Sequence, residues 1–348
     1  SCVLRDLVHK VQDELKIKHS NCLIATEIFH PETVNFLKET KTKFDKILPP
    51  TKSFKQIIKD EGFPIISKQI AQKISHIRNT KNHRKYIRAI FGLDDNTFGC
   101  LPLKYVHFLP IFGCLPMLPM FAKKIGIEDA GDVKDKDFCD YKISHKCCDF
   151  IKGNVKHDKR PVFIGTTIEE SRLRRNTWLK YGCIHYEKGK PDVCKPLSLM
   201  NESDIWRYIN ENKIVLSKIY SLGYNRSGCV CCGFGMSQEE ELKKKGLLKA
   251  NRFELLYQTN KLMFLTIFNK YGMWKPLADL RISLNIDDKK ILKKFINRQN
   301  KLKDWYKNIK KNLNRVLDEI ESRNPKCWNK KEREWILHKY SKGAKKWM

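Results

Sequence analysis

The sequence has few acidic residues for its length. It contains 39 Asp and Glu against 69 Lys and Arg among 348 residues, which gives a formal net charge of +30. So large an excess favours polyanionic partners, such as phosphorylated small molecules, RNA, DNA or an anionic membrane surface. Hydrophobic residues still make up 41% of the chain, which excludes wholesale disorder and fits a globular protein.

The sequence also lacks a long uninterrupted apolar run. Its first ten residues, SCVLRDLVHK, do not resemble a signal peptide. The most apolar segment, residues 105–122, contains Pro110, Pro116 and Pro119, which would remove helical hydrogen bonds. We therefore expect a cytoplasmic protein without membrane insertion. In that reducing compartment, clustered cysteines bind metal or do chemistry more often than they form disulfides.

Alternating helix and strand patterns predict an α/β fold with a parallel sheet and flanking helices. Apolar residues recur at helical spacing within 1–20, and residues 22–25 are typical of a strand. Pro31 is placed as the first residue of a second helix. Residues 162–164 are a further strand candidate, and residues 201–212 form a helix pattern with Asn201 or Ser203 as its N-cap.

The composition changes near the C-terminus. Residues 281–348 contain 21 Lys and Arg against 8 Asp and Glu. We expect residues 276–348 to be a helical, Lys-rich appendage whose outer surface is basic. Its lysines, interleaved with Trp and Tyr, suit a polyanion, although an amphipathic packing helix with a solvated lysine face has the same pattern.

Two pairs of cysteines have the spacing of a metal site. Cys147 and Cys148 are adjacent, and Cys229 and Cys232 form a C-x-x-C pair. Four soft thiolates can hold either zinc or an iron–sulfur cluster. Adjacent side chains diverge, which suits the separated corners of a four-iron cluster better than one small zinc ion. Buried thiols without a ligand remain the alternative, and Cys231 is interpreted as a spare thiol beside the pair.

A second pattern indicates anion binding. Gly165 follows the strand candidate 162–164 and precedes a Ser- and Arg-rich helix start, TTIEESRLRR. This arrangement presents backbone amides and guanidinium groups to phosphate or sulfate. Arg172 could hold a tetrahedral anion, with Arg174 or Arg175 adding a second contact. A solvated helix face with local ion pairs is the alternative.

Taken together, these residues resemble the phosphoadenosine phosphosulfate (PAPS) reductase family, which has an adenine-nucleotide α-hydrolase-like fold. The resemblance covers roughly residues 1–275. The motifs that carry it are SCVL at 1–4 (the end of an S-G-G-x-D-S phosphate loop), IATEIFHPET at 24–33, GFPIISK at 62–68, GTTIEESR at 165–172, PLS at 196–198 with DIWRYI at 204–209, and RSGCVCC at 226–232.

The resemblance implies a set of site residues. Nucleotide or anion binding would fall to Ser1, Thr26, Ser67, Lys68, Gly165, Glu170, Ser171 and Arg172. The C-C and C-x-x-C pattern is similar to the iron–sulfur branch of the family, which implies a [4Fe-4S] cluster on Cys147, Cys148, Cys229 and Cys232, with zinc as the alternative. No catalytic residue is assigned.

Three departures from the family pattern limit which functional residues of the family can be assigned in this sequence. We interpret the phosphate loop as truncated before Ser1. Ala25 and Met200 replace the acid and the tryptophan that are usual at those motif positions. The C-terminal E-C-G-[IL]-H motif of sulfonucleotide reductases does not occur in the sequence, so the cysteine that attacks the sulfur has no counterpart.

Three functions follow as hypotheses. The first is an enzyme that binds ATP, adenylyl sulfate or PAPS and acts in sulfonucleotide reduction or nucleotide-dependent sulfur transfer, with an electron or sulfur donor as partner. The second is a nucleic-acid-modifying sulfurtransferase acting on DNA or RNA. The third is a non-catalytic nucleic-acid-binding module stabilised by a four-cysteine metal site. A homo-oligomer is left open.

Overall fold

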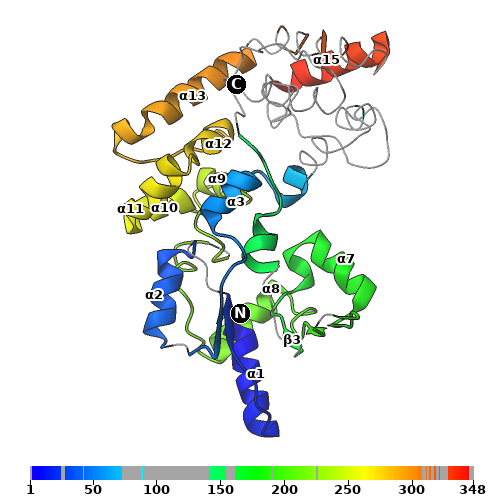
Figure 1. Cartoon of the computed structure of the whole chain (residues 1–348), viewed down its shortest axis with the longest axis vertical. Helices are drawn as coiled ribbons and strands as arrows, with labels where there is room; N and C mark the ends of the chain where they lie inside the picture. Colours follow the sequence, from blue (N-terminus) through cyan, green and yellow to red (C-terminus); the bar gives the residue numbers. More distant parts are fainter. Residues whose placement is uncertain are drawn as a thin grey trace. The chain divides into compact units, whose positions relative to one another are not determined.

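A computed structural model shows a mixed α/β chain (Figure 1). It describes residues 2–24, 28–41, 43–72, 88, 141–153, 161–189, 191–224, 226–307 and 328–344, together with 311, 313, 314, 317, 318 and 321. The apolar segment 105–122, Ser1 and Thr26 lie outside these residues. The chain divides into two compact units, one formed by residues 1–51 and 150–227 and the other by 52–149 and 228–348. The expected domains, 1–275 and 276–348, stay a prediction.

The first unit contains the predicted helices and strands. Its helices and helical turns are α1 (Cys2–Leu15), α2 (Pro31–Glu39), η4 (Ile168–Glu170), α7 (Arg172–Tyr181) and α8 (Glu202–Glu211). Its strands are β1 (Cys22–Ile24), β2 (Lys46–Leu48), β3 (Val162–Phe163), β4 (Ile184–His185) and β5 (Val193–Cys194). The turn η3 (Asp149–Gly153) lies where the chain passes between the units.

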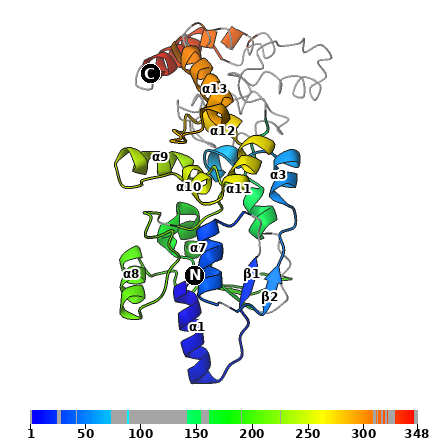
Figure 2. The same cartoon turned by 90° about the vertical axis from the view of Figure 1, so that its left-hand side faces the viewer.

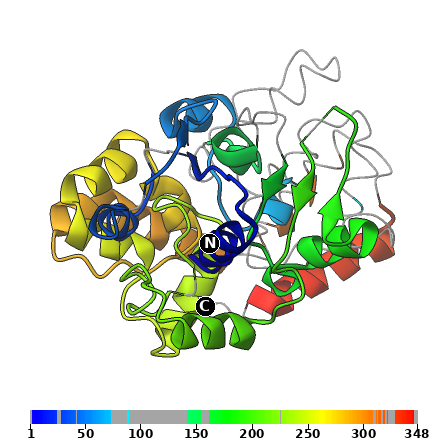
Figure 3. The same cartoon turned by 90° about the horizontal axis from the view of Figure 1, so that it is seen from below.

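The strands form two small sheets within this unit. β1 and β2 are parallel and lie side by side (Figure 2), with Leu23 opposite Ile47. β3, β5 and β4 form a three-stranded sheet (Figure 3), in which β3 is parallel and β4 antiparallel to β5. The parallel pairings agree with the expected sheet, whereas β4 adds an antiparallel edge strand.

The helix starts were predicted correctly because local side-chain contacts fix them. Pro31 is the first residue of α2, and His30 Nδ1 accepts a hydrogen bond from the amide of Glu32. Asn201 is the N-cap of α8, where its side chain accepts from the Asp204 amide at 2.8 Å, so Ser203 is not the cap. Such caps satisfy amides that have no partner inside the helix.

Helices α1 and α8 pack together through Val3, Leu197 and Ile209. At the edge of this contact, Tyr208 on α8 donates a hydrogen bond to Asp6 on α1 at 2.7 Å. Lys10 donates to the hydroxyl of Tyr208 at 3.1 Å and pairs with Asp6 at 3.0 Å. These hydrogen bonds hold the pKa of Asp6 below its ordinary value, with Tyr208 as the largest cause.

The second unit is helical. It contains α3 (Phe54–Asp60), α9 (Met236–Lys244), α10 (Arg252–Thr259), α11 (Lys261–Leu265), the turn η5 (Thr266–Lys270), α12 (Trp274–Asp279), α13 (Lys289–Lys307) and α15 (Lys330–Ala344). Its core contains the largest fully buried side chains, which are Phe54, Phe253, Phe264, Phe268, Ile57 and Ile65.

Helix α13 is lysine-rich, as expected, and it belongs to the same compact unit as α12. It packs beside α12 (Figures 1 and 2). Its inner face buries Leu292, Phe295 and Leu302. Arg298 on the same face donates two hydrogen bonds to the buried Asp279 of α12, at 2.6 and 2.8 Å. No helix in the described part of the chain has the length and apolar character needed to span a membrane.

Candidate functional site

Residues 62–66, here named the bridging segment, connect the two cysteine-bearing regions of the second unit. Phe63 pairs in parallel with Ile143, and its amide donates to the Lys142 carbonyl at 2.8 Å. Ile65 pairs in parallel with Gly233 on its other flank. The bridging segment therefore contacts residues shortly before Cys147 and residue 233 directly after Cys232.

Two glycines make this close approach feasible. Gly62 has φ +111°, and a Cβ there would lie 2.4 Å from the Lys142 carbonyl carbon. A Cβ on Gly233 would lie 2.6 Å from the Pro64 carbonyl oxygen and 2.7 Å from Ile65 Cγ2. Both distances are far inside van der Waals contact, so only glycine fits at either position.

The Cys231 thiol lies close enough to thiols of both cysteine regions for their charges to affect its pKa. Cys147 and Cys231 are buried, whereas Cys148, Cys229 and Cys232 are partly exposed. Burial raises the pKa of the Cys231 thiol well above its ordinary value, and the charges of Cys229, Cys147 and Cys232 raise it further. Cys231, interpreted from sequence as a spare thiol, therefore lies deepest in the group.

The predicted ligand set fits a metal site in its chemistry. All four cysteines belong to one unit, and soft thiolates suit zinc and iron–sulfur clusters alike. Among the residues that the structure describes, no three His, Cys, Asp or Glu side chains converge as the ligands of one metal ion would. The assignment of Cys147, Cys148, Cys229 and Cys232 as ligands stays a prediction.

The residues that follow the bridging segment begin a short helical turn. The Ser67 hydroxyl accepts a hydrogen bond from the Ile70 amide at 3.2 Å, which is the contact of an N-cap. Lys68 pairs with Asp149 at 2.8 Å, with both side chains more than 40% exposed. The structure thus gives both predicted anion-binding residues a local partner, and their role toward a nucleotide stays a prediction.

The predicted anion-binding residues 165–172, here named the anion loop, follow β3 in the first unit. The chain passes from β3 through Gly165 to η4 and then to α7, whose N-cap is Ser171. The Ser171 hydroxyl accepts from the Arg174 amide at 3.3 Å. Arg172 is the first residue of α7, and its side chain is outside the described ones. The strand–glycine–helix order that the sequence predicted is confirmed.

The two acids of this loop have structural partners. Glu170 accepts a hydrogen bond from the Thr167 amide at 3.0 Å and pairs with Arg174 at 3.1 Å. Glu169 accepts from the Glu202 amide at 3.0 Å, at the N-terminus of α8. Both carboxylates therefore stabilise helix starts, where negative charge is favourable. This local role accounts for the Glu169 carboxylate.

Sequence reasoning did not identify the residues that contact the cysteine loop, residues 229–232. Arg252, the first residue of α10, donates a hydrogen bond through Nη1 to the Cys229 carbonyl at 2.8 Å. Glu239 on α9 accepts from Arg252 Nε at 2.7 Å. An acid and an arginine separated by more than ten residues form no recognisable motif, so nothing in the sequence pattern pointed to this pair.

Comparison with known proteins gives one match. Residues 118–233 match the phosphoadenosine phosphosulfate reductase domain. Neither a curated protein nor a solved structure matches the chain. The matched stretch contains Cys147, the anion loop at Gly165 and the cysteine loop. Residues 118–233, about a third of the chain, are therefore similar to a phosphoadenosine phosphosulfate reductase domain.

Proposed function

We propose that this chain is an enzyme of sulfonucleotide chemistry that binds an adenine nucleotide and holds a [4Fe-4S] cluster on Cys147, Cys148, Cys229 and Cys232. The observation that carries the proposal is the bridging segment, which connects the two cysteine-bearing regions of one unit. The family match supports an adenine nucleotide as substrate. When bound, a four-thiolate cluster would supply a redox-active, charge-bearing group.

The residues of the anion loop would bind the sulfate or phosphate end of the nucleotide. Gly165 allows a close approach of the backbone, and Arg172 would neutralise the departing anion. Ser171 and Glu170 position the start of α7 through the contacts described above. The reaction is either reductive cleavage of a sulfonucleotide or nucleotide-dependent sulfur transfer, and the absence of an E-C-G motif keeps both open.

The cluster is tested on protein purified without oxygen. We expect a brown protein with broad visible absorption, together with iron and acid-labile sulfide. Cys229→Ser should abolish the colour, whereas Cys194→Ser in β5 of the first unit should retain it. A colourless protein containing stoichiometric zinc would replace the cluster with a structural zinc site, and an unchanged spectrum of Cys229→Ser would remove this residue from the ligand set.

The nucleotide is tested by binding and by product analysis. Sulfite release from adenylyl sulfate or PAPS with a reductant supports reduction, whereas pyrophosphate release from ATP with a sulfur donor supports sulfur transfer. Arg172→Ala should weaken nucleotide affinity by about 1.5–3 kcal/mol, the range for a hydrogen bond to a charged group. Arg207→Ala, which removes an exposed arginine from α8 of the same unit, is the matched control and should leave affinity unchanged.

A second candidate function, binding of nucleic acid, is favoured by the outer face of α13. Seven of its lysines are exposed: Lys289, Lys290, Lys293, Lys294, Lys301, Lys303 and Lys307. The one exposed acid on the helix, Asp304, pairs with Lys307. Among the described residues, no carboxylate pairs with Lys289, Lys290, Lys293, Lys294 or Lys303. A rigid helix with this face can contact successive phosphates.

This candidate is tested with fluorescently labelled single-stranded DNA and RNA. Replacing Lys289, Lys290, Lys293 and Lys294 by Glu should weaken binding. It should also reduce the slope of the logarithm of the binding constant against the logarithm of the salt concentration, because fewer phosphate contacts release fewer counterions. Reversing four dispersed exposed lysines, Lys16, Lys38, Lys188 and Lys213, changes the net charge equally and is the control. Equal losses in the two variants, or binding of anionic vesicles alone, would contradict a nucleic-acid face on α13.

A further inference from the structure

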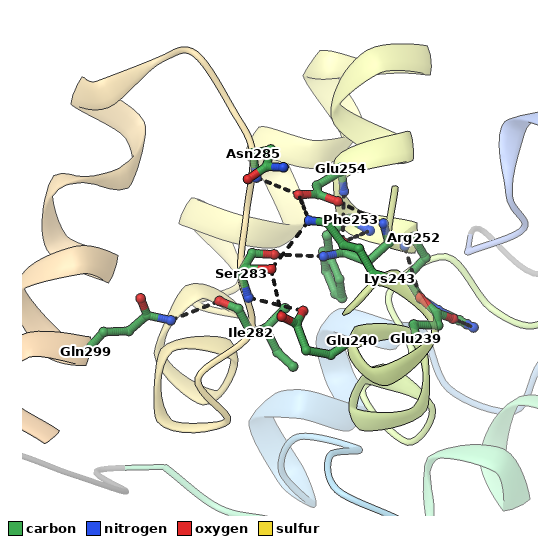
Figure 4. A network of polar contacts seen from close by, with 11 residues as sticks. Glu239, Glu240, Lys243, Arg252, Phe253, Glu254, Ile282, Ser283, Asn285 and Gln299 are labelled. Carbon is green, nitrogen blue, oxygen red and sulfur yellow. Dashed lines mark hydrogen bonds and ion pairs between the residues drawn. The ribbon is translucent and has the colours of Figure 1, made fainter. Parts of the chain in front are cut away.

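Helices α9 and α10 of the second unit meet at a network of buried charges (Figure 4). Glu239 and Glu240 on α9 and Arg252 and Glu254 on α10 are each less than 10% exposed. Buried charges are tolerated when they are paired and hydrogen-bonded. Such a concentration of paired charges therefore indicates that their geometry is tightly specified.

The carboxylates of this network have distinct partners. Glu254 pairs with Lys243 at 2.5 Å, and Glu240 accepts from the Ser283 hydroxyl at 2.7 Å (Figure 4). These two contacts hold α9, α10 and the segment before α13 together. Glu239 pairs with Arg252, whose backbone amide also donates to Glu239 Oε2 at 3.0 Å. Both ends of the arginine are therefore fixed by one carboxylate.

The side chain of Arg252 connects this network to the cysteine loop. Its Nε and Nη2 atoms donate to Glu239, while Nη1 donates to the Cys229 carbonyl at 2.8 Å. The guanidinium also lies against the backbone of Gly228, which has φ +50° and where a Cβ would be 2.9 Å from Nη1. A planar group with donors on several sides can make these contacts together, whereas a lysine ammonium cannot.

We propose that Arg252, held by Glu239, is a positioning residue that fixes the cysteine loop and keeps the Cys231 thiol inaccessible. The role of the loop as a cluster ligand rests on the proposed function. The positioning of the loop by Arg252 does not, because it can be measured on the thiols themselves. The Cys229 carbonyl cannot move away unless it gives up its hydrogen bond to Arg252 Nη1, and the ion pair with Glu239 keeps this donor in place. The loop should consequently open rarely by itself, and its thiols should keep the geometry that a ligand set needs.

The second unit contains a matched control for this proposal. Arg298 makes the same kind of buried, two-point ion pair with Asp279, at 2.6 and 2.8 Å. That pair connects α12 and α13 and has no contact with the cysteine loop among those described. Arg252→Lys and Arg298→Lys both keep the positive charge and both lose the planar fork. A purely structural role for Arg252 predicts that the two variants behave alike.

The experiment measures alkylation of Cys231 by iodoacetamide in the full-length native protein, mapped by mass spectrometry. Cys231 is 0% exposed, so it reacts when the loop opens. We expect Arg252→Lys to accelerate the reaction by about tenfold to hundredfold, the range for one lost hydrogen bond to a charged group. Arg298→Lys should leave the rate unchanged under conditions where urea denaturation shows both variants folded. Equal rates in the two variants, or an unchanged rate in Arg252→Lys, would overturn the proposal.

Two further measurements separate this proposal from the proposed cluster. If the wild type contains no iron while the alkylation contrast is present, the cluster is wrong and the positioning role stands. If both variants keep iron, visible spectrum and slow alkylation, the positioning role is wrong and the cluster stands. Should Arg252→Lys fail to fold, Glu239→Gln keeps the side-chain shape and weakens the hold on Arg252. It is expected to accelerate Cys231 alkylation in the same direction, and no acceleration would count against the proposal.

Discussion

Replacing Gly233 by alanine tests the close contact between the cysteine loop and the bridging segment. Gly233 does not have a positive φ, so alanine adds no backbone strain and the cost is steric. The new methyl group would lie 2.6 Å from the Pro64 carbonyl oxygen and 2.7 Å from Ile65 Cγ2, against 3.4 Å for ordinary contact. Overpacking of this kind costs about 1–3 kcal/mol of unfolding free energy.

The steric origin of this cost can be isolated with a double-mutant cycle. Ile65→Ala removes the Cγ2 atom and, because Ile65 is 0% exposed, should itself cost about 2–5 kcal/mol. The double variant Gly233→Ala/Ile65→Ala should lose less than the two single losses added together, because the second change makes room for the first. Coupling energies between residues in contact are about 0.5–3 kcal/mol.

Urea denaturation at equilibrium measures each free energy, and Gly246→Ala is the matched control. Gly246 has φ +71° and nothing within 4 Å of the position of a Cβ. Alanine there should cost about 1–2 kcal/mol through left-handed backbone strain alone. Its effect should add to that of Ile65→Ala without coupling. If Gly233→Ala were neutral, or if it were as additive with Ile65→Ala as the control, the packing described here would be wrong.

Three further outcomes are expected. Asp279→Asn leaves Arg298 buried without its charged partner and should destabilise the protein by about 3–5 kcal/mol in urea denaturation, with a loss below 1 kcal/mol contradicting a tight pair. The pKa of Asp6 is lowered in the folded state, so the stabilisation that Asp6 contributes is present above the ordinary value of 3.8 and is lost as the pH falls through the folded value. Tyr208→Phe removes the largest cause of this shift and should therefore reduce the difference in urea midpoint between neutral pH and pH below 3.8. An unchanged difference would refute this. Asn251→Ala removes the buried cap that accepts from two amides of α10, and it should cost about 1–2 kcal/mol by the same assay, whereas Asn251→Asp should retain most of the stability.

Local signals explain what the sequence predicted correctly. Pro31 and Asn201 determine helix starts through contacts within three residues, so their roles are visible in the sequence itself. The strand at 162–163 followed by Gly165 and the helix after Ser171 was likewise predicted, because turn and cap residues act on their neighbours. The family match confirmed the resemblance over residues 118–233.

Contacts between distant residues explain what the sequence could not predict. Cys231 was interpreted as a spare thiol because no spacing rule includes it, whereas its burial depends on the fold of the whole unit. The pairing of Arg252 with Glu239 and Cys229 spans two helices and a loop. The lysine pattern of α13 predicted a basic outer surface and left open an amphipathic packing helix, but it did not reveal that Arg298 pairs with Asp279 of another helix.

The order in which the bridging segment acquires its partners has a consequence for biosynthesis. Phe63 and Ile65 are translated long before Ile143 and Gly233, and pairing across such separations must first overcome the entropy of closing large loops. Cys147 and Cys148 therefore emerge from the ribosome before the cysteine loop and Gly233 have been made. Until Gly233 has been synthesised, the bridging segment lacks its second partner, so we expect these thiols to be more accessible to oxidants and the yield of intact protein to depend on how reducing the cell is during translation.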